Sequence, residues 1–192
     1  MVTPMLRALA LMLLATPALA EMRPQEADRL AAFDATFGSA MRQAMEGGSR
    51  GDVDLLQEAL AGAPLPPLQT TLAGDWRCRT LKLGGNLPLV TYAPFDCRIT
   101  PEGTTFTLEK LTGSQLTRAR ITLIEDQMIY LGVGYVADVE PLDYGDLPQG
   151  PFGDGERQPQ VGIVEQPGPD TIRILFPDPI VESDFDILYL TR

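Results

Sequence analysis

The chain has 192 residues, with 26 acidic and 15 basic side chains, no histidine and a formal net charge of −11. This balance excludes the basic surface that nucleic-acid-binding proteins present to phosphates. The lack of histidine excludes Ser-His-Asp and Cys-His catalytic arrangements, and two cysteines alone cannot complete a metal site. We therefore predict a protein that is not an enzyme and that carries no cofactor and no metal.

The first twenty residues have the features of a secretory signal peptide. Arg7 supplies a positive charge, Ala8–Ala15 form a short apolar run, and Ala18-Leu19-Ala20 matches the small-x-small cleavage pattern. We predict cleavage after Ala20, a periplasmic location and no stable membrane insertion after cleavage. An apolar run this short is not expected to anchor the chain in a bilayer.

Two helices are predicted next. The first spans Pro24–Glu46, where Gly47-Gly48 follows, and the second spans about Asp52–Leu60. The first carries an apolar stripe at three- and four-residue spacing, formed by Leu30, Phe33, Phe37, Met41 and Met45. We expect this helical hairpin to dock on the rest of the protein through that stripe. The proline-rich segment Ala63–Leu68 should form a stiff, extended connection.

The segment Gly74–Thr100 predicts two antiparallel strands with one apolar and one charged face. We expect a register that places Cys78 opposite Cys97. Its apolar face would carry Trp76, Cys78, Phe95, Cys97 and Ile99. Because an exported chain meets an oxidising compartment, we predict that Cys78 and Cys97 form a disulfide.

The charged face of the same pair carries Arg77, Arg79 and Arg98. In the expected register Arg77 faces Arg98, and like charges directly opposite each other are destabilising. Two explanations stay open at this point. The arginines form a salt-bridge ladder beneath the N-terminal helices, with Asp96 or Glu109 as partners, or they bind an anion or carboxylate.

Beyond Leu72 the helical period disappears and short strands follow one another. The predicted strands are Gly74–Leu83, Thr91–Thr100, Thr104–Leu111, Gln115–Ile124, Gln127–Tyr135, Gln158–Glu165, Asp170–Phe176 and Phe185–Arg192. Eight strands with mostly hairpin-length links favour a mainly β fold, an eight-stranded antiparallel up-and-down barrel of the calycin-like type, and a sandwich is the alternative. The predicted parts are a signal peptide (1–20), a helical hairpin (21–62), a proline-rich linker (63–71) and a β-barrel domain (72–192).

The longer connections should gather at one end of the barrel and form its mouth. These are Gly84–Val90, the short turn Thr112–Ser114, Val136–Arg157 and Pro177–Asp184. The candidate ligand-binding residues there are Tyr92, Asp143, Tyr144, Asp146, Phe152 and Asp184. The acidic loop Val136–Arg157 lacks the spacing of a calcium loop, and an ordinary surface loop is the alternative to a ligand-binding role. Eight-stranded barrels either fill with side chains or hold one small ligand.

Trp76 and Arg192 should be neighbours at the opposite end, where the first and last strands of a closed barrel meet. This Gly-x-Trp and C-terminal arginine pairing resembles the signature of lipocalin-like and avidin-like barrels. Arg192 would then stack on the indole and mark barrel closure.

Longer segments resemble a more specific family. GDWRCRTLKLGG (74–85), LVTYAPFDCRI (89–99), EKLTGSQLTRARI (109–121), MIYLGVGYV (128–136) and VGIVEQPGPDTIRILFPDPIVESDFDILYL (161–190) occur in a characteristic order. They are similar to the uncharacterised bacterial domain-of-unknown-function 4893 family of exported proteins. The resemblance implies a Gram-negative periplasmic setting and paired cysteines, and it implies no activity.

Together these features predict an exported, non-enzymatic binding module that holds a small ligand at the barrel mouth. The alternative is a protein-interaction or inhibitor module of the cell envelope that acts on a basic partner, as the negative charge favours.

Overall fold

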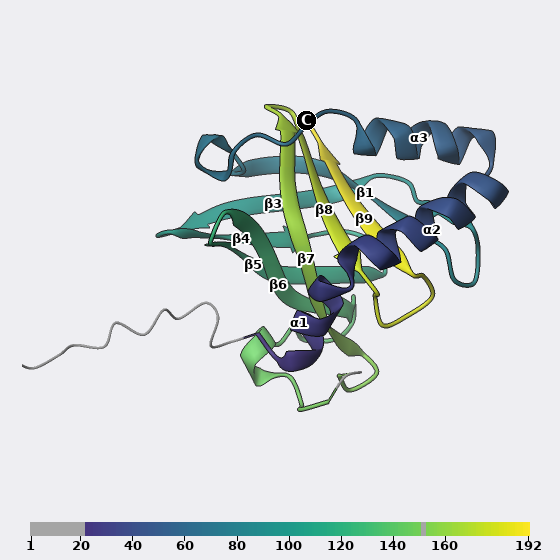
Figure 1. The fold of residues 1–192 in the computed structure, drawn as a ribbon. Helices are drawn as coiled ribbons and strands as arrows, with labels where there is room; N and C mark the ends of the chain where they lie inside the picture. The colour runs from purple at the N-terminus through teal and green to yellow at the C-terminus, as the bar shows by residue number, and fades with distance from the viewer. Residues whose placement is uncertain (1–21, 151–152) are drawn as a thin grey trace, which may run out of the picture.

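The computed structural model describes residues 22–150 and 153–192, so the predicted signal peptide lies outside the described residues. Three α-helices precede a sheet of β-strands in these residues (Figure 1). The helices are α1 (Pro24–Ala31), α2 (Phe33–Gly47) and α3 (Arg50–Leu60). The strands are β1 (Gly74–Leu83), β2 (Leu89–Thr91), β3 (Phe95–Glu102), β4 (Thr105–Lys110), β5 (Gln115–Ile124), β6 (Gln127–Val136), β7 (Arg157–Gly168), β8 (Thr171–Pro177) and β9 (Phe185–Thr191). Short 3₁₀ turns, η1 (Pro67–Gln69) and η2 (Tyr144–Asp146), lie between them.

The sheet closes into an up-and-down barrel because β1 pairs with both β3 and β9. All pairings are antiparallel, and β3 to β9 follow each other in chain order. The small strand β2 pairs with β1 at Leu81–Leu83, beyond the part of β1 that pairs with β3. Eight strands therefore form the closed wall, which confirms the predicted barrel over the sandwich.

Side chains alternate between the two faces of each strand, and this places the buried apolar residues in two separate clusters. Even-numbered positions of β1 and β9 face the barrel interior, and odd-numbered positions face outward. The interior cluster includes Trp76, Cys78, Ile99, Leu108, Ile121, Tyr130, Ile172, Ile174 and Leu190. The outer cluster lies beneath α2 and α3 and includes Leu81, Leu83, Phe185 and Ile187 with Ala40, Ala44 and Leu56. Both faces of β1 and β9 are thus buried at one side of the barrel.

The helices dock on this outer face as the apolar stripe predicted. The Phe37 ring lies 5.1 Å from that of Phe185, and the Phe33 ring lies 5.4 Å from it. The prediction of one helix over Pro24–Glu46 is wrong, because the helix is interrupted at Ala32 (φ −84°, ψ 3°). The interruption lets α2 cross over β8, β9 and β1 while α1 turns toward β7 (Figure 1).

The predicted register of the first strand pair is wrong by two residues. Trp76 lies opposite Cys97, and Cys78 lies opposite Phe95. The cysteines are therefore diagonal neighbours, and they form the predicted disulfide with Cα atoms 5.8 Å apart. An even shift keeps every side chain on its predicted face.

The same shift changes which charges face each other. Arg77 lies opposite Asp96, and Arg98 lies opposite Asp75. Each arginine forms an ion pair with the aspartate across from it, and Arg79 donates to the Tyr92 carbonyl at 2.9 Å. The Arg77 and Arg98 side chains are 52% and 54% exposed, so the N-terminal helices do not cover them as the salt-bridge hypothesis assumed.

Candidate functional site

A cavity of about 560 Å³ opens at the end of the barrel opposite Trp76. Around it the sheet interior changes from apolar to polar and charged. The charged residues that line it are Arg29, Lys82, Lys110, Glu156, Glu182 and Asp186. Phe176 and Leu188 contribute apolar surface. A concave site of this volume with a few converging polar groups is the usual form of a small-molecule site.

Polar side chains of neighbouring strands form part of the cavity wall. In the barrel register Lys110 pairs with Thr117, Thr117 with Gly134, and Gly134 with Gln158. Thr117 hydrogen-bonds to Tyr130, whose hydroxyl also donates to Gln160 Oε1 at 3.1 Å. Burial raises the pKa of Tyr130, so its hydroxyl remains protonated and can donate.

Gly134 provides room for this network. A Cβ atom at Gly134 would lie 2.5 Å from the Gln160 side-chain amide, closer than normal contact allows. Gly134 therefore lets the Gln160 amide lie inside the barrel against β6.

On the other side of the cavity, Lys82 lies between two carboxylates. Lys82 pairs in register with Asp186 of β9, and its Nζ lies 2.6 Å from Glu182 Oε2. Burial alone would lower the pKa of Lys82, but the hydrogen bond with Glu182 and the charge of Asp186 raise it overall. Burial raises the pKa of Asp186 to about 6, against a hydrogen bond from the Ser183 hydroxyl that favours the charged form.

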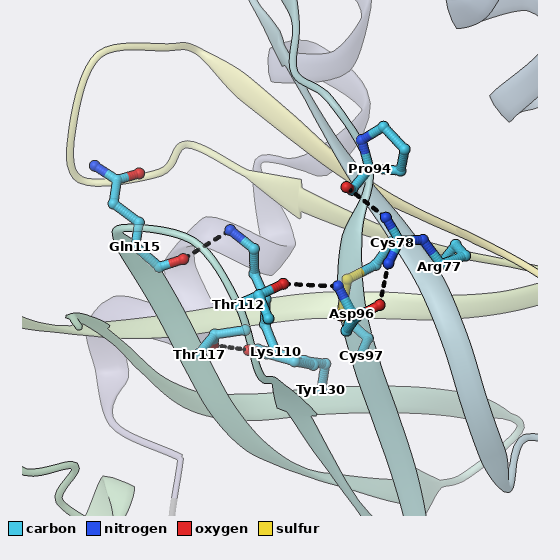
Figure 2. Close-up of a disulfide and its surroundings, with 10 residues drawn as sticks. All are labelled: Arg77, Cys78, Pro94, Asp96, Cys97, Lys110, Thr112, Gln115, Thr117 and Tyr130. Atoms are coloured by element: carbon cyan, nitrogen blue, oxygen red, sulfur yellow. Dashed lines mark hydrogen bonds and ion pairs between the residues drawn. A yellow bond between two sulfur atoms is a disulfide. The ribbon is translucent and has the colours of Figure 1, made fainter.

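Lys110 has different surroundings. Its Nζ donates to the Gln115 carbonyl at 2.7 Å and lies 4.1 Å from the centre of the Phe95 ring. Figure 2 shows Lys110 extending toward Gln115 beside the Cys78–Cys97 disulfide. Burial, and then the charge of Lys82, lower the pKa of Lys110. No carboxylate among residues 22–150 and 153–192 forms an ion pair with it.

Arg29 of α1 completes the rim. Its guanidinium donates to the Pro177 and Pro159 carbonyls at 3.2 Å and 3.1 Å, and it joins the ends of β7 and β8. Burial lowers the pKa of Arg29, and the nearby carboxylates, Glu26 first, oppose that shift. Helix α1 thus lies at the cavity because two strand-end carbonyls hold it there.

The long loop between β6 and β7 folds back over the outside of the barrel. Tyr144 and Leu147 are buried against Val133, which faces outward from β6. The Tyr144 hydroxyl donates to Glu26 at 2.5 Å, and the Arg23 guanidinium donates to the Leu147 carbonyl at 2.7 Å. Tyr144 therefore fastens the loop to α1 and does not line the cavity. Of the loop residues that the structure describes, those that line the cavity are Val136, Gly155 and Glu156, at its two ends.

Four other predicted ligand-binding residues, Tyr92, Asp143, Asp146 and Asp184, also lie away from the cavity wall. Tyr92 is 40% exposed beyond β2. Asp143 and Asp146 are exposed, with Asp143 3.9 Å from Arg118. Asp184 accepts from the Gln43 amide at 2.6 Å and links the β8–β9 loop to α2. Phe152 lies outside the described residues.

Sequence reasoning located the mouth but missed the residues that line it. Three of the missed residues are charged: Lys82, Lys110 and Asp186. Each is an even number of residues from an interior residue of the same strand (Cys78, Leu108 and Leu188, respectively), so its side chain is on the interior face. The sequence could have revealed them, because side chains alternate between the two faces of a strand and these charged residues continue the apolar face toward the open end of the barrel.

Residues 19–190 match the family described as a domain of unknown function (DUF4893). The chain belongs to this family. The match covers the helices as well as the barrel, whereas the sequence segments compared above began near Leu72. No curated protein and no solved structure matches the chain. None of the described helices has the length and apolar character needed to cross a membrane.

Proposed function

We propose that this protein is an exported binding module that holds one small polar ligand in the mouth of its barrel. The cavity of about 560 Å³, lined by both apolar and charged side chains, carries the proposal. Burying ionisable groups such as Lys110 and Asp186 costs free energy, and a bound polar ligand would offset part of that cost. The N-terminal signal pattern and the buried disulfide support export to an oxidising compartment.

The geometry of the loops supports this function over an interaction module for a basic partner. The described part of the loop between β6 and β7 packs against β6 and α1 through Tyr144 and Leu147. The interaction hypothesis rests on the net charge of −11 and on the exposed aspartates of this loop.

Native mass spectrometry of protein isolated from its own cell envelope tests the proposal. We expect a non-covalent mass increment that disappears on denaturation. In the variant Gln158→Trp an indole would occupy the cavity, because Gln158 lines it opposite Gly134, and the increment should be lost.

The matched control is Gln127→Trp, the same substitution at an exposed position at the start of β6. This variant should retain the increment. An increment that persists in folded Gln158→Trp protein, or that is missing from the wild type, would contradict binding in the mouth.

A further inference from the structure

The basic residues of this chain are distributed unequally between arginine and lysine. Of its 15 basic side chains only two are lysines, Lys82 and Lys110. Both line the mouth cavity, and both are about nine-tenths buried. An ammonium group is a compact charge with three donors, whereas the planar guanidinium suits fixed bidentate pairs. The two compact cations of the chain thus lie within one cavity.

The two lysines differ in how their charge is compensated. Lys82 has Glu182 at 2.6 Å and Asp186 directly across the strand pair. The Lys110 ammonium contacts the Gln115 carbonyl oxygen and the face of the Phe95 ring, and neither of these groups carries a formal charge. An ammonium group can donate three hydrogen bonds, and Lys110 uses one of them on Gln115. Arg29 also forms no ion pair, but it donates to two strand-end carbonyls and has the carboxylates of Glu26 and Asp186 nearby. Lys110 is therefore the one ammonium group of the cavity that has donors available and no carboxylate close to it among the described residues.

The cavity also limits the charge that it would accept. Three basic residues (Arg29, Lys82 and Lys110) and three acidic ones (Glu156, Glu182 and Asp186) line it. A dianion would meet three carboxylates, whereas a single negative charge suits the one uncompensated ammonium. The apolar side chains of Phe176 and Leu188 would accommodate a short hydrocarbon body.

We infer that the mouth cavity binds a small organic carboxylate, with its oxygens accepting hydrogen bonds from Lys110 and its aliphatic part against Phe176 and Leu188. This inference rests on the proposed function and names the chemical class of the ligand. Charge-assisted hydrogen bonds from a buried ammonium are among the stronger polar contacts, because the surroundings screen them little.

The test uses the fact that the chain has two lysines. Protein expressed from the full coding sequence with ¹³C-lysine should give two Cε–Hε signals, which Lys82→Arg and Lys110→Arg variants assign. The probes are butanoate, 1-butanol and inorganic phosphate at constant ionic strength. We expect butanoate to shift the Lys110 signal saturably and to raise the apparent pKa of Lys110, because an anion stabilises the charged form. Butanol should leave that pKa unchanged, and phosphate should have a much smaller effect.

Variants give the second arm of the test. Lys110→Met removes the charge with little change in side-chain length, and it should weaken butanoate binding about tenfold or more, read on the Lys82 signal. The matched control Arg42→Met removes an exposed cation on α2 and should leave binding unchanged.

Three results would overturn the inference. They are a Lys110 signal that does not respond to butanoate, a response to phosphate of equal strength, and equal butanoate binding by Lys110→Met protein. If the native mass increment is nevertheless present and Gln158→Trp removes it, ligand binding in the mouth stands and only its assignment to a carboxylate fails. If both experiments are negative, the proposed function fails as well.

Discussion

The Arg192 guanidinium carbon lies 3.8 Å from the centre of the Trp76 ring. The penultimate residue of the chain, Thr191, pairs with Arg77 of β1, so this stack lies where the last strand meets the first. Arg192 also donates to the Thr71 carbonyl at 3.0 Å. Together these contacts cover the closed end of the barrel, where Trp76 is 3% exposed.

Replacing Arg192 with Ala should lower the free energy of unfolding by about 1–2 kcal/mol, since the cation–π contact and the hydrogen bond are both lost. Trp76 is the only tryptophan, so its fluorescence during urea unfolding reports directly on this end. Arg192→Lys should give an intermediate value, because lysine keeps the charge but loses the planar stack. An unfolding midpoint equal to that of the wild type would show that the stack contributes nothing to closure.

Removing the disulfide with Cys78→Ala and Cys97→Ala together should cost roughly 3 kcal/mol, because the unfolded chain regains the freedom of the closed loop. The two cysteines are 19 residues apart and at most 1% exposed. Native protein should therefore resist both reduction and alkylation, and become sensitive only in urea. Mass analysis that finds two alkylated thiols in native, unreduced protein would contradict the bond.

Asp186 should make the protein less stable as pH rises. Its pKa of about 6 in the folded protein exceeds the ordinary value of 3.8. The folded state therefore holds a proton more tightly than the unfolded chain does, and this stabilisation is complete below pH 4 and lost as pH rises through about 6. Lys82, Glu182 and Arg29 act on the same group, and burial is the largest cause.

Asp186→Asn should remove that dependence. The difference in urea midpoint between variant and wild type should be small at pH 4 and should favour the variant at pH 7.5. Using the difference cancels the contributions of other carboxyl groups, such as Asp154, whose pKa is lowered by hydrogen bonds from Arg157. A constant difference across this pH range would mean that Asp186 does not titrate there.

Phe37→Ala should lower the free energy of unfolding by about 3 kcal/mol, because the ring packs against Phe33 and Phe185 in the outer cluster. Met45→Ala is the control, since Met45 belongs to the same predicted stripe but is 52% exposed. Met45→Ala should change stability by less than about 0.5 kcal/mol. Equal losses in the two variants would show that α2 is not anchored through Phe37.

Side-chain alternation, together with the connection lengths and the signal pattern, predicted the eight wall strands, the barrel and the disulfide. The prediction of one strand over Thr91–Thr100 is wrong, because the chain forms the short β2 at Leu89–Thr91 and begins β3 only at Phe95. Period-2 patterns depend on which face of the sheet is buried, and that information is local. Two predicted strands, Gly74–Leu83 and Gln115–Ile124, have the predicted limits in the structure. The partner of Cys78 was clear because the chain has only one other cysteine.

The register of the first strand pair needed the tertiary structure. A shift of two residues leaves Trp76 and Cys78 on the apolar face, so hydrophobic patterning cannot distinguish the two alignments. The difference lies in the charges, because the observed register pairs Arg77 with Asp96 and Arg98 with Asp75. In the predicted register two of these arginines faced each other.

The site was also decided at the tertiary level. The sequence by itself indicated which end of the barrel would be open, from the lengths of the connections. It did not determine the direction of the long loop, which depends on the burial of Tyr144 and Leu147 against Val133 and on hydrogen bonds to α1. Nor did it bring Lys82 and Lys110 together, because they belong to strands that are separated by β3 and meet across the interior only when the barrel closes.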